Sequence, residues 1–268
     1  MRAAMRATRS AEAPLSRRPS ERPIRAVTLD CWGTLFLDGP GSDERYRRQR
    51  LAGMRTALAG VGIAVAPGAL DRAYAATGRW LGSLWKVHRD VSIRGHVEAL
   101  LKAVDPALAD QVSAKAMAAL IHAYASPAMV ASPAVDPGAR GALETLAADG
   151  MLLAVVSNTM RTPGEVLRQV LAEADLLPLF KVLTFSDECG IRKPAPAIFH
   201  RTLADLGVPP GEAVHVGDDP VLDVEGAQDA GMRAIQVTPD GRGTAPVRPD
   251  AVIRDLGRLP AALGRLRR

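Results

Sequence analysis

Four short groups of polar residues in this chain have the types needed for phosphoryl transfer. They supply one carboxylate on a tight turn, hydroxyl and amide donors, one cation and an acidic cluster: Asp30 in DCWGTL, Ser157-Asn158-Thr159, Lys193-Pro194, and Asp218, Asp219 and Asp223 in GDDPVLD. An acidic cluster facing a further carboxylate suits Mg²⁺, which prefers hard oxygen ligands. Hydroxyl and amide groups beside a lysine form an anion pocket, and an exposed carboxylate can attack phosphorus.

Short apolar runs precede these groups and predict buried β-strands. The runs are nearly continuous, which is typical of strands covered on both faces; they are 26–30, 152–157, 182–185, 213–217 and 234–237, with a further short strand at 251–253. Helical patterns alternate with them, and Thr162-Pro163-Gly164-Glu165 has the form of a helix-start capping box. The alternation predicts an α/β protein with a mostly parallel sheet. Ligands bind at the carboxyl ends of such strands, so we expect the four groups to converge there.

One long interval interrupts the alternation of strands and helices. Residues 42–131 show only helical patterns, which cover 42–60, 68–86, 92–104 and 106–124. At roughly 90 residues the interval is too long for a loop and predicts an inserted helical cap domain. The predicted division is therefore a disordered basic tail (1–24), a core (25–41 and 132–268) and a helical cap (42–131).

The charge of the chain is concentrated at its start. The net charge is +5, and residues 1–25 hold seven arginines and two glutamates, which accounts for the whole excess. A neutral body with a basic tail is not a basic binding face, so we expect no nucleic-acid partner. No stretch of 18 apolar residues predicts a membrane span, and two cysteines cannot form a disulfide framework. We therefore expect a cytoplasmic monomer or homodimer acting on a small molecule.

The four groups together resemble a known superfamily. They stand in the stretches LDCWGTL, VVSN, GIRKPAPAIF and HVGDDPVLDVEGAQDAGM, which span residues 26–232. In this order the stretches resemble the motifs of the haloacid dehalogenase (HAD) superfamily of hydrolases. The resemblance implies a Rossmann-like core and a helical cap that closes over the site and selects the substrate.

The resemblance also implies a role for each residue. Asp30 would be the nucleophile and Thr34 would support its loop. Ser157, Asn158 and Lys193 would hold the transferred group, with Trp32 beside them. The implied Mg²⁺ site consists of Asp30, the backbone carbonyl of Trp32, Asp218 and the assisting carboxylates Asp219 and Asp223.

Trp32 departs from the pattern of the family's phosphatases, which carry a second Asp two residues after the nucleophile. Indole can only donate a hydrogen bond and cannot serve as the general acid. In a phosphatase, His88 or His96 of the cap would then have to supply the proton. Three functions stay open. The acidic fourth group favours a Mg²⁺-dependent phosphatase acting on a small phosphorylated metabolite. Trp32 suits a metal-independent 2-haloacid dehalogenase, or a variant that cleaves a C–P bond through Lys86 or Lys102. A non-catalytic binding domain is the third.

Overall fold

The computed structural model describes residues 23–37, 41–243 and 247–267. The predicted basic tail therefore lies outside the described residues, apart from Pro23 and Ile24. Ile24 is 4% exposed and packs into the main apolar cluster. The packed part of the chain thus includes the last residue that the sequence assigned to the tail.

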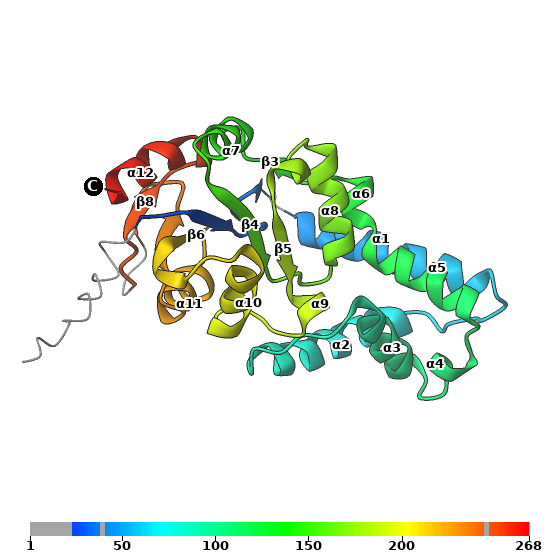
Figure 1. Cartoon of the computed structure of the whole chain (residues 1–268). Coiled ribbons are helices and arrows are strands. Elements are labelled where there is room, and N and C mark those ends of the chain that lie inside the picture. Colours follow the sequence, from blue (N-terminus) through cyan, green and yellow to red (C-terminus); the bar gives the residue numbers. More distant parts are fainter. Residues whose placement is uncertain (1–22, 38–40, 244–246, 268) are drawn as a thin grey trace, which may run out of the picture.

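A six-stranded parallel sheet forms the centre of the molecule (Figure 1). Its strands lie in the order β5 (Val182–Phe185), β4 (Leu152–Ser157), β1 (Ala26–Leu29), β6 (Ala213–Gly217), β7 (Arg233–Val237) and β8 (Ala251–Ile253). All six correspond to predicted runs, so the predicted α/β class is confirmed. The strands are apolar because helices cover both faces of the sheet.

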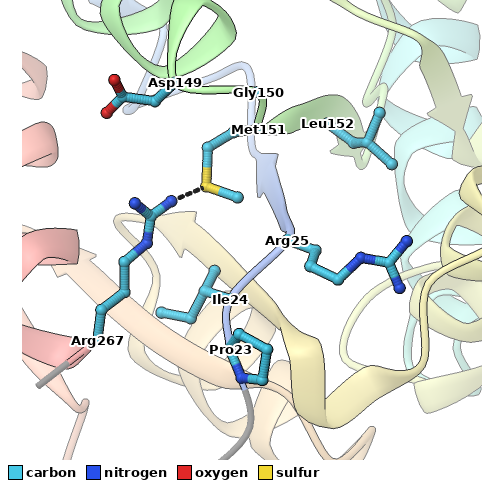
Figure 2. A pocket seen from close by; sticks show the side chains of 8 residues that line it. All are labelled: Pro23, Ile24, Arg25, Asp149, Gly150, Met151, Leu152 and Arg267. Carbon is cyan, nitrogen blue, oxygen red and sulfur yellow. Dashed lines mark hydrogen bonds between the residues drawn. The ribbon is translucent and has the colours of Figure 1, made fainter.

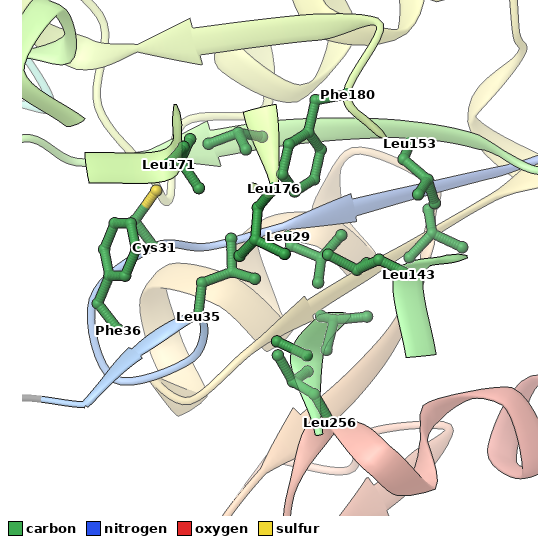
Figure 3. Packing of buried hydrophobic residues seen from close by; sticks show 14 of the residues in the cluster. Leu29, Cys31, Leu35, Phe36, Leu143, Leu153, Leu171, Leu176, Phe180 and Leu256 are labelled. Atoms are coloured by element: carbon green, nitrogen blue, oxygen red, sulfur yellow. The ribbon is translucent and has the colours of Figure 1, made fainter. Parts of the chain in front are cut away.

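Helices on each face of the sheet bury a separate apolar cluster. One face carries α7 (Ala139–Ala148), α8 (Gly164–Glu173) and α12 (Leu259–Leu266), and the other carries α10 (Pro196–Leu206) and α11 (Gly226–Asp229). Leu29 and Leu153 pack in the first cluster (Figure 3), whereas Ala26 and Val156 pack in the second. Successive strand residues point to opposite faces, which explains this division.

Short elements complete the core around these layers. They are the antiparallel pair of strands β2 (Phe36–Leu37) and β3 (Ala134–Val135), helix α9 (Ser186–Cys189), the 3₁₀-helices η2 (Leu177–Leu179), η3 (Pro210–Glu212) and η5 (Leu256–Arg258), and the π-helix η4 (Pro220–Glu225). The predicted capping box at the start of α8 is wrong. The hydroxyl of Thr162 accepts a hydrogen bond from Arg50, and the Gly164 N–H at the start of the helix donates to Asp187 Oδ1 at 3.2 Å.

Residues 42–131, called the cap below, contain helices and no β-strand. The helices are α1 (Ser42–Ala59), α2 (Ala69–Trp85), α3 (Ile93–Val104), α4 (Leu108–Gln111), α5 (Ala114–Ala125) and α6 (Pro127–Val130). The single helix predicted at 106–124 is two helices, because Ser113 starts α5 by accepting a hydrogen bond from the Ala116 N–H. The cap has its own apolar cluster, which includes Met54, Leu100 and Tyr124. Within the described ranges, no helix combines the length and apolarity needed to cross a bilayer.

Candidate active site

Three of the four predicted groups meet at one edge of the sheet because β1 pairs in parallel with both β4 and β6. Asp30 follows β1, Ser157 ends β4, and Asp218 follows β6. Lys193 enters from the loop between α9 and α10, and its Nζ lies 2.7 Å from Asp30 Oδ1. The predicted convergence of the four groups is therefore present in the structure.

Lys193 is the cation at the centre of this site and is 2% exposed. Its Nζ lies 2.5 Å from Asp223 Oδ1 in addition to its contact with Asp30. Burial by itself would lower the pKa of Lys193, but Asp223 and Asp30 together raise it above its ordinary value. The lysine is therefore charged at neutral pH and holds two carboxylates in place.

A buried hydrogen-bond chain orients Asp223 towards Lys193. Asp223 Oδ1 lies 3.1 Å from His215 Nε2, and His215 Nδ1 lies 2.7 Å from the hydroxyl of Thr28. Burial lowers the pKa of His215, so the neutral ring donates from Nε2 to Asp223 and accepts the Thr28 hydroxyl proton at Nδ1. Neither Thr28 nor His215 was among the predicted site residues. The sequence feature that could have identified them is a polar residue in each of two otherwise apolar strands, at positions that pair with each other.

The carboxylates of Asp30, Asp218 and Asp223 form a group that suits a divalent cation. One oxygen of each lies within 4.8 Å of the others. Both oxygens of Asp223 are already engaged, because Oδ2 accepts the Asp219 N–H at 3.0 Å. Within the described ranges, the one hydrogen-bond donor to the Asp218 side chain is the Thr34 hydroxyl, at 3.5 Å. Burial and then the charges of Asp30 and Asp223 raise the pKa of Asp218 to about 7. A cation between Asp30 and Asp218 would remove this repulsion, so the donors fit Mg²⁺.

Asp219 and Thr34 lie beside this carboxylate group. The Asp219 carboxylate accepts the backbone N–H groups of Val221 and Leu222, each at 2.8 Å, and so caps η4. That engagement leaves Asp219 outside the group of three carboxylates. Thr34 is fully buried and contacts Asp218 rather than Asp30.

Ser157 and Asn158 have different surroundings at the end of β4. Ser157 Oγ is buried beside the Asp30 carboxylate, where its hydroxyl acts to lower the pKa of Asp30, so it faces the reacting group. The Asn158 side chain accepts the Lys193 N–H at 2.9 Å and donates to the Lys193 carbonyl at 3.1 Å. Asn158 therefore holds the backbone of Lys193 in place.

Trp32 and the cap enclose a cavity of about 520 Å³. Its lining comes from the core and from α1 and α2: Trp32, Asp43, Glu44, Tyr46, Arg47, Arg50, Tyr74, Trp85, Met160, Arg161 and Thr162. The Trp32 ring packs edge-on against Phe36, and its Nε1 is buried without a partner among the described residues. His88 and His96, the predicted cap proton donors, do not line this cavity.

The cap is bonded to the loop that carries Lys193. Arg89 and Ile191 form an antiparallel bridge, and the Asp90 N–H donates to the Gly190 carbonyl. The Asp90 carboxylate lies 2.5 Å from Arg192 and accepts the Ser186 hydroxyl at 2.6 Å. We call these contacts the clasp; it joins the cap to the residue next to Lys193.

A second hollow lies at the opposite edge of the sheet, by the amino ends of β1 and β4 (Figure 2). It encloses about 550 Å³ and is lined by Pro23, Ile24, Arg25, Asp149, Gly150, Met151, Leu152 and Arg267. The Arg267 guanidinium contacts the sulfur of Met151 within it. None of the predicted site residues lines this hollow; they lie at the carboxyl edge of the sheet.

The fold and site define a class: α/β proteins with an acidic, lysine-containing edge beneath a helical insertion. Within that class, the model of the haloacid dehalogenase-like hydrolase family matches residues 24–231. The chain belongs to this family of hydrolases, which confirms the resemblance drawn from its sequence.

Similar proteins include both phosphatases and dehalogenases. Haloacid dehalogenase-like hydrolase domain-containing protein 3 of Xenopus laevis is 40% identical over 40% of this chain and 42% of its own length. A phosphoserine phosphatase of Thermus thermophilus is 40% identical over 38% of this chain and 39% of its own. The matches thus span about two fifths of these relatives.

Solved structures match over most of the chain. A 2-haloacid dehalogenase from Pseudomonas syringae pv. Tomato aligns with a TM-score of 0.66 and 28% identity over 90% of this chain and 99% of its own. A HAD phosphatase from Thermococcus onnurineus aligns with a TM-score of 0.57 and 27% identity over 90% and 98%. Both reactions therefore occur on folds similar to this one.

Proposed function

We propose that this hydrolase is a Mg²⁺-dependent phosphatase that cleaves a small phosphorylated metabolite in the cytoplasm through an aspartyl-phosphate. The observation that carries the proposal is the Asp218 carboxylate, which lies against Asp30 and Asp223 with no cationic partner of its own among the described residues. A metal-independent reaction has no need of a third carboxylate here. Asp30 and Asp218 would hold Mg²⁺, with the Trp32 carbonyl as the further expected ligand.

Asp30 is the nucleophile of the proposed reaction. One of its oxygens attacks phosphorus, the bond from phosphorus to the ester oxygen breaks, and the alcohol leaves with the bonding electrons and takes up a proton from water. Water then attacks the phosphorus of the aspartyl-phosphate, which releases inorganic phosphate and restores the carboxylate. When bound, Mg²⁺ supplies positive charge that offsets the charge of the phosphoryl group.

Residues around Asp30 bind and orient the phosphoryl group. Lys193 holds Asp30 at 2.7 Å and keeps its proton at neutral pH, so it balances negative charge throughout the reaction. The buried hydroxyl of Ser157 faces Asp30 and would donate to a phosphoryl oxygen bound there. Asn158 fixes the backbone of Lys193, and the His215–Asp223 pair fixes its ammonium group.

Trp32 favours a second candidate, the metal-independent 2-haloacid dehalogenase. There Asp30 displaces halide from carbon and forms an ester, and halide leaves without a proton. The dehalogenase of Pseudomonas syringae is among the similar structures. We rank this reaction second because it gives the Asp218 carboxylate nothing to bind.

The test is phosphate release from a panel of alkyl and aryl phosphates, with Mg²⁺ and with EDTA. Halide release from 2-chloropropionate is measured in parallel, and Asp30→Asn is the blank for both reactions. We expect phosphate release that needs Mg²⁺ and is lost in Asp30→Asn. EDTA-insensitive halide release without phosphate release would replace the phosphatase by the dehalogenase. If neither phosphate nor halide is released, the result would favour the non-catalytic binding domain.

A further inference from the structure

The cavity between cap and core lies within reach of the reacting group. Trp32 is two residues from Asp30, and Met160 is three residues from Ser157. Because consecutive Cα atoms are about 3.8 Å apart, these wall residues lie within roughly 8 and 11 Å of the site residues, measured between Cα atoms. Asp30, Ser157 and Lys193 do not line the cavity themselves, so a ligand held there would reach Asp30 across this short separation.

Two guanidinium groups in the cavity wall have no carboxylate partner among the described residues. Arg50 is 4% exposed and donates to neutral oxygens of Tyr124, Arg161 and Thr162, at 2.9 to 3.2 Å. Arg161 stacks on the ring of Tyr74 with its guanidinium carbon 3.8 Å from the centroid. Stacking uses a face of the planar group and leaves its N–H edge able to bind an oxyanion.

Arg47 in the same wall provides the contrast. It pairs with Glu44 at 3.0 Å and with Asp71 at 2.5 Å, so its charge is balanced within the protein. Asp43, the other acid of the lining, is an exposed residue in the first turn of α1. Arg50 and Arg161 are therefore the two wall arginines that no carboxylate pairs with among the described residues.

Aromatic and apolar side chains make up a further part of the wall. Trp32, Tyr74 and Trp85 line the cavity together with Met160. Aromatic faces favour planar apolar groups, which stack on them with offset or edge-on geometry. The cavity thus combines aromatic walls with a cation, and a ligand complementary to it is flat and negatively charged.

We infer that this cavity binds the untransferred part of the substrate, and that this part is a flat apolar group bearing a carboxylate that pairs with Arg161. The inference rests on the proposed function for the place of the phosphoryl group at Asp30. The binding of the carboxylate does not depend on which reaction Asp30 performs.

The first experiment measures binding without turnover. Affinities of 4-hydroxybenzoate and phenol for the full chain are compared by ligand-observed NMR titration. We expect 4-hydroxybenzoate to bind at least about tenfold more tightly, since a charge-assisted hydrogen bond to Arg161 is available only to the carboxylate. Arg161→Gln removes the difference, Arg161→Lys keeps part of it, and Arg79→Gln, an exposed arginine of α2, keeps all of it.

The second experiment compares kcat/KM for 4-carboxyphenyl phosphate and phenyl phosphate in the same variants. We expect a preference of about tenfold for the carboxylated ester that Arg161→Gln abolishes. Equal binding of 4-hydroxybenzoate and phenol, or a preference that survives Arg161→Gln in a variant with wild-type thermal stability, would overturn the inference even where phosphate is released. Preferential binding without phosphate release would sustain the carboxylate site and remove the proposed phosphatase reaction.

Discussion

Trp32 stands two residues after the nucleophile, where its indole can donate a hydrogen bond but cannot pass a proton to a leaving oxygen. Installing an acid there should speed the reaction wherever the leaving group is poor. We expect Trp32→Asp to raise kcat/KM for an alkyl phosphate by about 10²-fold or more, the usual contribution of general acid catalysis. The gain for an activated aryl phosphate should be much smaller.

Trp32→Asn is the matched control, because Asn has the size of Asp without its acidity. It should change the shape of the cavity as much as Trp32→Asp does and should leave the alkyl and aryl rates in their original ratio. Phosphate release from both esters under Mg²⁺ checks the prediction. An equal gain in Trp32→Asn and Trp32→Asp would show that the space vacated by indole, rather than the acid, is responsible.

Gly33 occupies a backbone position that only glycine fits well. Its φ is 76°, and a Cβ atom there would collide with the Asp218 carboxylate. We expect Gly33→Ala to destabilise the fold by ~1–2 kcal/mol and to weaken Mg²⁺ binding, since the displaced carboxylate is a proposed ligand. Urea unfolding and a Mg²⁺ titration of activity measure the two effects.

Gly141 provides the comparison for Gly33. It lies within α7, and nothing stands within 4 Å of where its Cβ would be. Gly141→Ala should stabilise the protein by about 0.5–1 kcal/mol, because alanine favours helix, and should leave the Mg²⁺ dependence unchanged. Weakened Mg²⁺ binding in both variants would contradict a local effect at Asp218.

At the scale of elements, the clasp joins the loop between α2 and α3 to the loop between α9 and α10. Burial by itself would raise the pKa of Asp90, but contacts with His96, Arg192 and Ser186 lower it to about 2. A carboxylate with a lowered pKa stabilises the fold above its unfolded pKa of about 3.9, and that stabilisation disappears as the pH falls towards 2. The difference amounts to about 2–3 kcal/mol.

Asp90→Asn tests this account of the clasp. At pH 7 the variant should lose about 3–5 kcal/mol of unfolding free energy, because it leaves Arg192 buried without a counter-charge. The gap between the variant and the wild type should be constant from pH 5 to pH 7 and should narrow below about pH 4. Urea unfolding across this range measures it. A gap of unchanged size at pH 3 would refute the role given to the charge of Asp90.

The elements also show what a sequence can predict. Apolar runs located all six strands of the sheet, because burial on both faces leaves a continuous pattern. Because ligands bind at the carboxyl ends of parallel strands, Asp30, Lys193 and Asp218 could also be predicted to lie at one edge of the sheet. The sequence pattern missed the Asp90–Arg192 pair, which joins residues 102 apart in the chain and leaves no local pattern. It also missed Arg161, since a stacked guanidinium depends on where the cap lies.

At the scale of the whole molecule, three apolar clusters stabilise the protein, one on each face of the sheet and one in the cap. The cap cluster is separate, and α2, α3 and α4 pack mainly on one another and on the other cap helices. We expect the amide hydrogens of the sheet and those of the cap to exchange through different unfolding events. Amides of β1 and β6 should exchange only by global unfolding, and those of α3 and α4 by an earlier, partial opening.

Hydrogen exchange followed by mass spectrometry checks this division, with urea added in steps to separate partial from global opening. The exchange free energies of α3 and α4 should lie below the value for β1 and depend less on urea. Equal values for the cap and the sheet would show one cooperative unit. Asp90→Asn serves as the comparison, and it should lower the cap values more than those of β1.

The antiparallel bridge between Arg89 and Ile191 limits how such a protein can be recombined. A cap grafted from a relative brings its own residues at positions 88–90 but not the loop of residues 190–192. Without an acid at position 90, Arg192 stays buried and unpaired beside Lys193. Cap and lysine loop are therefore one unit of exchange, and a chimera should keep both from the same parent.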